Sequence, residues 1–137
     1  VTEFIDKVYK MFQNHNTPVT MWGHIGEGNL HVQPLLDLSQ LGDRQKTFKI
    51  MDEYYELVKD FGGSTSAQYN DGRLRGPYLK GMYGDDVYEL FQKVKKIFDP
   101  YNILNNGVKI DVDKDSIMPL VRHQFSLQHL YSHMPRT

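Results

Sequence analysis

The sequence predicts one domain of the α+β class, in which helices cover one face of an antiparallel sheet. Two observations carry this prediction. Apolar residues recur at helical spacing in three separate segments, and a glycine-rich segment between two strand-like runs is typical of a β-hairpin. The chain has 137 residues, which is the length of one domain, and 39% of them are hydrophobic. A core of ordinary size can therefore form.

The first predicted helix covers residues 3–14. Its apolar residues share the spacing of one helix face: Phe4, Ile5, Val8, Met11 and Phe12. Thr2 stands just before the helix and can cap its N-terminus. The polar residues that lead to Pro18 end it.

A hairpin is predicted next, with strands at residues 19–22 and 30–36. A tight turn at Glu27 and Gly28 would join them, because glycine supplies the positive φ that such a turn needs. This register places His24 opposite His31, with Cβ atoms about 5 Å apart. Asn29 and Gln33 fall on the same face of the hairpin because side chains alternate along a strand.

Two imidazoles that converge in this way suit one divalent metal such as zinc. His24 and His31 are therefore candidate metal ligands. The alternative is an ordinary hairpin that carries two histidines on its polar face, and the hairpin alone does not decide between them. The chain has no cysteine, so thiolate sites, thiol catalysis and disulfides are excluded.

The second predicted helix begins with Asp43 as its cap and stops at Gly62 and Gly63. Four residues form its apolar face: Phe48, Met51, Tyr55 and Val58. Residues 64–75 are small or polar and lack any periodicity. A loop of this kind between two helices is a typical place for function, with a plain solvated loop as the alternative.

The third predicted helix has Asp86 as its cap and Glu89 three residues later, a pattern that resembles a capping box. Its apolar stripe consists of Val87, Leu90, Phe91, Val94, Ile97 and Phe98. We expect this stripe to lie in the core. Asp99 and Pro100 end the helix, and residues 104–110 form a turn that leads into a short extended piece.

Residues 111–137 are predicted to be a tail, separate from a domain that spans residues 1–110. The tail holds His123, His129 and His133, and we expect it to make contacts rather than bind metal. The first residue is not Met, so we expect a fragment of a longer chain.

The net charge of −1 provides no electrostatic basis for binding nucleic acid or an anionic membrane. No apolar run reaches the ~20 residues of a membrane span. We expect a cytoplasmic protein and leave peripheral association with a membrane open. Neither a P-loop nor a glycine-rich dinucleotide fingerprint after a strand is present in the sequence.

Three segments, in this order, resemble a known family. Residues 23–31 resemble the Gly-His-x-Gly-Asp-Gly-Asn-x-His motif of the C-terminal domain of FAD-linked oxidases, within the vanillyl-alcohol oxidase superfamily. Residues 62–73 are similar to its Gly-Gly-x-x-Ser-Gly-Glu-His-Gly-x-Gly-Arg motif, and residues 98–109 to its Phe-Asp-Pro and Leu-Asn-Pro-Gly-Lys ending. The group includes D-lactate dehydrogenase, the D subunit of glycolate oxidase and D-2-hydroxyglutarate dehydrogenase.

The resemblance implies a ferredoxin-like α+β domain that covers a flavin held mainly by a preceding FAD-binding domain of the same chain. It implies that His24 and His31 bind a divalent metal, often zinc. Asn29, Asn105 and Gly107 would contact the cofactor or line its site. Gln33 would face the substrate, typically a D-2-hydroxy acid.

This sequence departs from the family pattern in the second motif. Gln68 stands where the family has the glutamate ligand, and Tyr69 stands where it has the histidine base. An amide is a poorer metal ligand than a carboxylate, and tyrosine is a poor base near neutral pH. Gln68 and Tyr69 remain the catalytic candidates, and Tyr69 can still donate a hydrogen bond. Arg73 and Arg75 are candidate anchors for a substrate carboxylate, or else two solvated loop charges.

The sequence therefore predicts the substrate and cap domain of an FAD-dependent oxidoreductase that oxidises a small 2-hydroxy acid. We expect it to be inactive without the FAD-binding domain. A non-catalytic metal- or ligand-binding module with a degraded active site is the first alternative, and an interaction domain that uses its tail is the second. A homodimer is left open.

Overall fold

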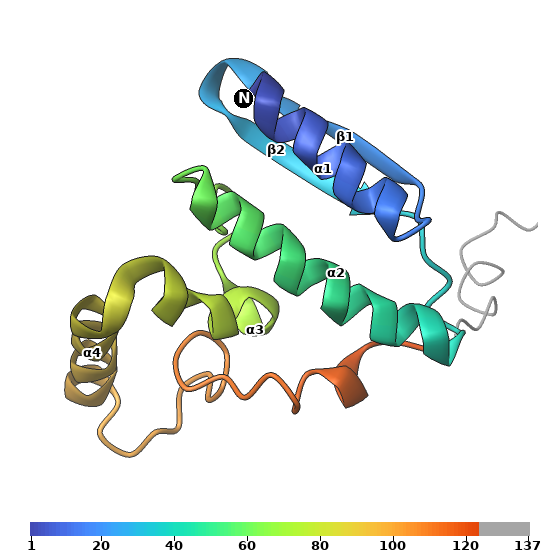
Figure 1. Cartoon of the computed structure of the whole chain (residues 1–137). Helices are drawn as coiled ribbons and strands as arrows, with labels where there is room; N and C mark the ends of the chain where they lie inside the picture. The colour runs from blue at the N-terminus through green and yellow to red at the C-terminus, as the bar shows by residue number, and fades with distance from the viewer. Residues whose placement is uncertain (124–137) are drawn as a thin grey trace, which may run out of the picture.

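The computed structural model describes residues 1–123. Four α-helices, three short 3₁₀ turns and two strands follow one another along this part of the chain (Figure 1). Their bounds are α1 Thr2–Asn14, β1 Val19–His24, η1 Ile25–Glu27, β2 Asn29–Pro34, α2 Leu41–Asp60, α3 Gly72–Arg75, η2 Gly76–Tyr78, α4 Leu79–Phe98 and η3 Met118–Leu120.

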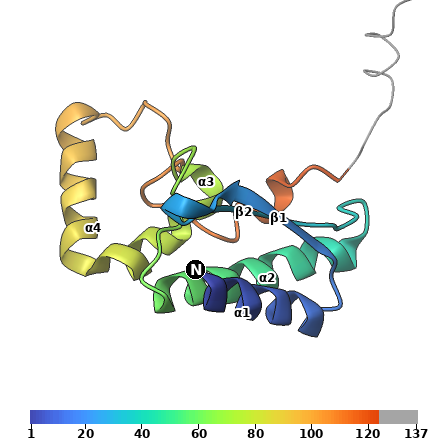
Figure 2. The same ribbon diagram turned by 90° about the horizontal axis from the view of Figure 1, so that it is seen from above.

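The core lies between the hairpin and the first two helices. Val8, Met11 and Phe12 of α1 pack with Ile50 of α2, and one face of the hairpin covers them. Figures 1 and 2 show α1 and α2 side by side with the hairpin against them. The α+β class is thus confirmed. The ferredoxin-like arrangement is not established, because residues 1–123 contain a sheet of two strands.

The C-terminus of α2 confirms the predicted stop. Gly62 has φ +66°, in the left-handed region that glycine adopts freely. The Gly62 amide donates to the Lys59 carbonyl and the Gly63 amide to the Val58 carbonyl, at 2.9 and 2.8 Å. These two bonds form a Schellman motif.

The helix starts differ from the predictions. No side-chain capping bond is found at either α1 or α2, so the proposed Thr2 and Asp43 caps are wrong. Helix α2 begins two residues before Asp43. The Asp43 carboxylate instead accepts the Asp37 amide at 2.9 Å, and so fixes the loop that enters the helix.

The hairpin is confirmed, but its predicted register is wrong. His24 pairs with Asn29, and Trp22 pairs with His31. The reason is the connection: Ile25–Glu27 form a 3₁₀ turn closed by Gly28 at φ +68°, which is longer than the two-residue turn expected. His24 and His31 still fall on one face, but as diagonal neighbours rather than opposite each other.

Helix α4 is divided by Gly84, whose φ of 79° and ψ of 170° are accessible essentially only to glycine. The predicted start at Asp86 lies two residues beyond this break. Before it, Leu79 is fully buried, while after it the helix stands apart from α1, α2 and the hairpin (Figures 1 and 2). The prediction that its apolar stripe is core is therefore wrong, since most of these side chains are exposed.

The chain after α4 returns along α2 towards its N-terminal end (Figure 1). Residues 104–110 form turns and bends rather than a strand. Ile117 is buried, and Lys114 pairs with Asp52 of α2. The predicted boundary at residue 110 stays a prediction, and His129 and His133 lie outside the described residues.

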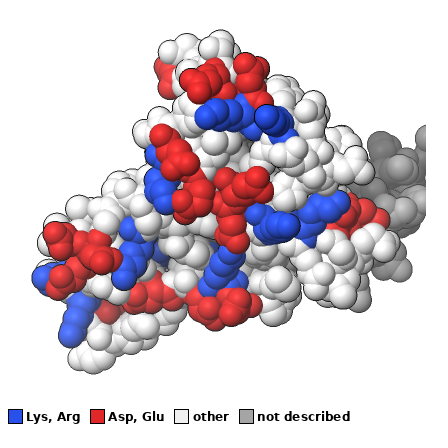
Figure 3. All heavy atoms as spheres, viewed as in Figure 1, with Lys and Arg blue, Asp and Glu red and all other residues white. Residues whose placement is uncertain are grey.

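Acidic and basic side chains are interspersed over the face of the molecule seen in Figure 3. Several of the described ion pairs join residues distant in sequence, such as Asp71 with Lys109 at 2.8 Å. Within residues 1–123 no helix has both the length and the apolar character needed to cross a bilayer.

Candidate functional site

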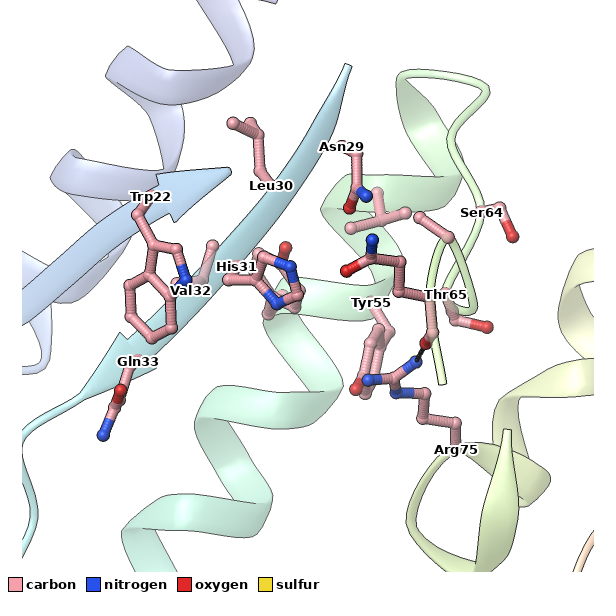
Figure 4. A pocket seen from close by; sticks show the side chains of 14 residues that line it. Trp22, Asn29, Leu30, His31, Val32, Gln33, Tyr55, Ser64, Thr65 and Arg75 are labelled. Atoms are coloured by element: carbon pink, nitrogen blue, oxygen red, sulfur yellow. Dashed lines mark hydrogen bonds between the residues drawn. The ribbon is translucent and has the colours of Figure 1, made fainter. Parts of the chain in front are cut away.

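A cavity of about 320 Å³ lies between strand β2, helix α2 and the loop of residues 64–71. We call it the hairpin cavity (Figure 4). Side chains that can hydrogen-bond line much of it: Asn29, His31, Gln33, Tyr54, Tyr55, Ser64, Thr65, Gln68 and Arg75. Its size suits a small ligand.

The charge of the hairpin cavity has one sign. Arg75 is the guanidinium in its lining, and none of the described residues that line it is acidic. Burial raises the pKa of Tyr54 to about 12, and burial likewise raises the pKa of Tyr55. Both phenols are therefore neutral hydrogen-bond donors at physiological pH. The cavity thus offers donors and a cation to an anionic ligand.

Arg75 also holds the loop that carries Gln68. Its Nη1 atom donates to the Gln68 carbonyl at 2.7 Å and to the Asn70 carbonyl at 3.1 Å. In this loop, Tyr69 and Asn70 have φ of 64° and 59°. This left-handed conformation is unusual for a bulky residue. The two bonds from Arg75 stabilise this conformation and so place the Gln68 side chain at the cavity.

His31 lies in an aromatic stack beside the cavity. The Trp22 ring is parallel to it within 13°, with centroids 5.6 Å apart, and the Tyr69 ring lies 5.9 Å away. Tyr69 itself does not line the cavity and is 85% exposed. The structure therefore brings together Asn29, His31 and Gln68, and leaves Tyr69 outside them.

His24 is exposed at the end of β1 and does not line the hairpin cavity. Within residues 1–123, no group of three or more histidine and acidic side chains is arranged to hold a metal ion. The residue at the position of the family's third ligand is the neutral Gln68. The donor set therefore does not fit the expected zinc site, and a metal at His24 and His31 is not supported.

Asn105 and Gly107 lie in a second cavity, which we call the α4 cavity. Its lining includes Phe91, Val94 and Leu104 on the apolar side, and Asn70, Lys95 and Lys109 on the polar side. Arg73 does not reach the hairpin cavity. Instead its Nη1 donates to the Gly107 carbonyl at 3.2 Å, which ties α3 to the wall of the α4 cavity.

Residues 68–75 lie between the two cavities and contribute side chains to the lining of each. Gln68 and Arg75 line the hairpin cavity, while Asn70 lines the α4 cavity and accepts a hydrogen bond from Lys109 at 3.2 Å. The mixed apolar and amide-bearing wall of the α4 cavity has the donor chemistry that suits the polar edge of a flavin ring.

Sequence reasoning missed three residues of the site. Trp22 lies two residues before His24, so strand alternation could have placed it on the site face. Tyr55 was expected only as core, and Tyr54 was not considered, although both line the hairpin cavity. No pattern in the sequence links Arg75 to Gln68, because that bond depends on the loop conformation.

The described residues form an α+β domain in which the lining of the hairpin cavity suits a small anionic molecule. The family described as FAD linked oxidases, C-terminal domain, matches residues 1–108. The chain therefore belongs to the FAD-linked oxidase family of flavoprotein oxidoreductases, as its C-terminal domain.

Named relatives agree with this assignment. The chain is 33% identical over 117 residues to D-2-hydroxyglutarate dehydrogenase of Haemophilus influenzae (strain ATCC 51907 / DSM 11121 / KW20 / Rd), covering 85% of this chain and 11% of that protein. It is 29% identical over 107 residues to the enzyme of the same name from Escherichia coli (strain K12), covering 78% and 10%. It is 30% identical over 108 residues to D-lactate dehydrogenase of Anaerostipes hadrus, covering 78% and 23%.

The chain spans between about a tenth and a quarter of the length of these relatives. Their names describe dehydrogenation of hydroxy acids by proteins far longer than this one.

Proposed function

We propose that this chain is the substrate-side domain of an FAD-dependent oxidoreductase that converts a small 2-hydroxy acid into a 2-oxo acid. The observation that carries the proposal is the lining of the hairpin cavity, which offers Arg75 and several neutral donors with no carboxylate among its described residues. Two of the relatives named above are D-2-hydroxyglutarate dehydrogenases and one is a D-lactate dehydrogenase.

In this proposal, the residues that line the hairpin cavity bind and orient the substrate. The Arg75 guanidinium pairs with the substrate carboxylate, since it is the cation in the lining. The amides of Asn29 and Gln68 and the phenol of Tyr55 orient the substrate by hydrogen bonds. Gln33 lines the same cavity and faces the substrate's far end. The Tyr69 ring lies beside the His31 ring, with centroids 5.9 Å apart.

In this proposal, His31 is the general base, because its imidazole lines the hairpin cavity. The unprotonated imidazole has a nitrogen that can accept the proton of the substrate hydroxyl. FAD, when bound, supplies the acceptor for the hydride that leaves the substrate's α-carbon. The products are the 2-oxo acid, reduced flavin and protonated His31.

Most of the FAD is held by an FAD-binding domain that precedes this one in the same polypeptide. Asn105 and Gly107, which lie in the α4 cavity, would help to hold the cofactor. The protein is cytoplasmic in this proposal. No step requires a metal.

Two matched histidine variants test the proposal in the full-length polypeptide. His31→Asn should slow the reduction of bound flavin by a 2-hydroxy acid by about 10²-fold or more, the usual effect of removing a general base. His24→Asn should leave that rate unchanged, because His24 lies outside the cavity. Equal losses in both variants, with recovery on addition of zinc, would contradict the proposal and restore the two-histidine metal site.

A second candidate is a non-catalytic ligand-binding module. It is favoured by Gln68 and Tyr69, which replace the family's glutamate and histidine. The full-length protein would then respond to a 2-hydroxy acid with a perturbed flavin spectrum but no loss of flavin absorbance.

A further inference from the structure

A further cavity adjoins the hairpin cavity. It has a volume of about 380 Å³ and lies beside the hairpin turn, between the start of α1, the end of α2 and the loop that follows α2. We call it the turn cavity. Five of the described residues line both it and the hairpin cavity: Leu30, Tyr54, Val58, Ser64 and Ala67. The two cavities therefore have a wall in common, and we call these five residues the shared wall.

The shared wall is largely apolar and lies away from the cation of the hairpin cavity. Three of its side chains contain only carbon: Leu30, Val58 and Ala67. Phe4 and Phe61 continue this apolar surface into the turn cavity. Arg75 lines the hairpin cavity but not the turn cavity, and Figure 4 shows Leu30 and Arg75 on opposite sides of the His31 ring. A ligand whose carboxylate is held by Arg75 therefore meets apolar side chains at the side that faces the turn cavity.

The charges of the two cavities fit one carboxylate and not two. Arg75 is the one lysine or arginine among the described residues that line either cavity. Its Nη1 atom already donates to two carbonyls of the loop, which leaves the rest of the guanidinium for one carboxylate. The amides of Asn29, Gln33 and Gln68 are neutral, and the charged side chain in the turn cavity is the acid Glu27. A second carboxylate on the ligand would therefore leave water without gaining a cation, which is strongly unfavourable.

An apolar side chain on the ligand has the opposite effect. Contact with the shared wall removes apolar surface of the ligand from water, and each buried methylene strengthens binding severalfold. A 2-hydroxy acid with a branched alkyl side chain therefore gains affinity where a dicarboxylic acid loses it.

We propose that the substrate is a monocarboxylic 2-hydroxy acid with an apolar side chain of several carbons. Its carboxylate pairs with Arg75, and its side chain packs against the shared wall. The inference rests on the proposed function and narrows the substrate within it. Two relatives are named for D-2-hydroxyglutarate, a dicarboxylate, so the inference separates the substrate of this chain from theirs.

Two acids of nearly the same shape test the inference in the full-length, FAD-loaded polypeptide. D-2-Hydroxyisocaproate carries an isopropyl group where D-malate carries a carboxylate. Anaerobic mixing gives the rate constant of flavin reduction and the dissociation constant of each acid. The ratio of these constants should be about 100-fold or more higher for D-2-hydroxyisocaproate, and D-2-hydroxyglutarate should react as poorly as D-malate.

Two neighbouring substitutions test where the apolar side chain lies. Ala67 belongs to the shared wall, whereas Ser66 lines neither of the two cavities. Ala67→Leu should lower the preference for D-2-hydroxyisocaproate over glycolate by about tenfold or more, because the added side chain occupies space at the wall. Ser66→Leu makes a similar enlargement in the same loop and should keep the wild-type preference. Equal changes in the two variants would overturn the placement at the shared wall.

The other outcomes separate this inference from the proposed function. Reduction by D-malate or D-2-hydroxyglutarate that equals or exceeds reduction by D-2-hydroxyisocaproate would overturn the inference and leave the proposed function in place. Absence of reduction by every 2-hydroxy acid would contradict the proposed function, and binding of 2-oxo acids, followed by the flavin spectrum, then tests the inference. 4-Methyl-2-oxopentanoate should bind about tenfold or more tightly than 2-oxoglutarate. The reverse order, or binding of neither acid, would overturn the inference.

Discussion

Two buried aspartates show how single residues hold the segments around the site. Asp99 accepts the backbone amides of Ile103 and Leu104, each at 2.9 Å, and also pairs with Lys95. It therefore fixes the turn that ends α4, which gives the Phe-Asp-Pro motif a structural role. Asp71 is less well satisfied: one oxygen pairs with Lys109, and the other has no hydrogen-bond partner among the described residues.

Asp99 should make stability depend on pH. The hydrogen bond from Lys95, helped by the two backbone amides and opposed by burial, lowers its pKa from 3.8 to about 2. A pKa lowered in the folded state stabilises the protein above the unfolded value and loses that effect as pH falls through the folded value. Urea unfolding should show wild type and Asp99→Asn differing most above pH about 4 and converging towards pH 2. A constant difference over this range would contradict the assignment.

The Asp71–Lys109 pair should behave as a coupled unit. Lys109→Met leaves a buried carboxylate without its cation, and we expect a loss of about 2 kcal/mol in the free energy of unfolding. Adding Asp71→Leu removes the carboxylate and should recover part of that loss. Urea unfolding of the two single variants and the double variant measures the coupling, and additive effects would show that the pair contributes nothing.

At the scale of elements, Gly84 decides where α4 points. Its backbone conformation separates the start of the helix, where Leu79 is buried, from the second half, where most apolar side chains are exposed. Gly81 offers a matched comparison on the same helix, because it has no positive φ and no atom lies within 4 Å of an added Cβ.

Gly84→Ala should therefore destabilise the protein by about 1–3 kcal/mol, since alanine cannot adopt this conformation without strain. Gly81→Ala should be neutral or stabilise it by up to about 1 kcal/mol through helix propensity. Thermal unfolding of both variants makes the comparison. Equal effects at the two positions would mean that α4 is a continuous helix in solution.

The sequence predicted which helices, strands and turns form better than it predicted how these elements pair and pack. The hairpin, the Schellman stop at Gly62 and the helix end at Asp99 follow from local chemistry and are confirmed. The register of His24 was missed because it depends on a 3₁₀ turn that residue types alone do not specify. The stripe through Leu90 and Ile97 has the spacing of a core helix, and this spacing alone does not reveal that the described residues leave it exposed.

For the candidate site too, the sequence identified the residues better than it predicted which of them lie together. Asn29, His31, Gln33, Gln68 and Arg75 were predicted and lie together in the hairpin cavity. Asn105 and Gly107 lie in the α4 cavity, and Arg73 bonds to its wall, because the loop of residues 68–75 folds between the two. The roles of all these residues stay predictions.

At the scale of the whole molecule, the described residues form a body with an open cavity on each side of one loop and an apolar face next to one of them. The purified 137-residue chain should therefore bind no stoichiometric FAD, because in the proposed function most flavin contacts come from a preceding domain. Absorbance spectroscopy of that chain checks the expectation. Flavin that survives gel filtration in a one-to-one ratio would contradict it.

The central claim is that this domain serves the oxidation of 2-hydroxy acids by FAD. The measurement that tests it most directly is anaerobic mixing of the full-length, FAD-loaded polypeptide with D-lactate, glycolate and D-2-hydroxyglutarate in turn. We predict loss of the oxidised flavin absorbance with at least one of them, together with one equivalent of the matching 2-oxo acid. Oxidised flavin that persists with all three, and with a wider set of 2-hydroxy acids, would contradict the account.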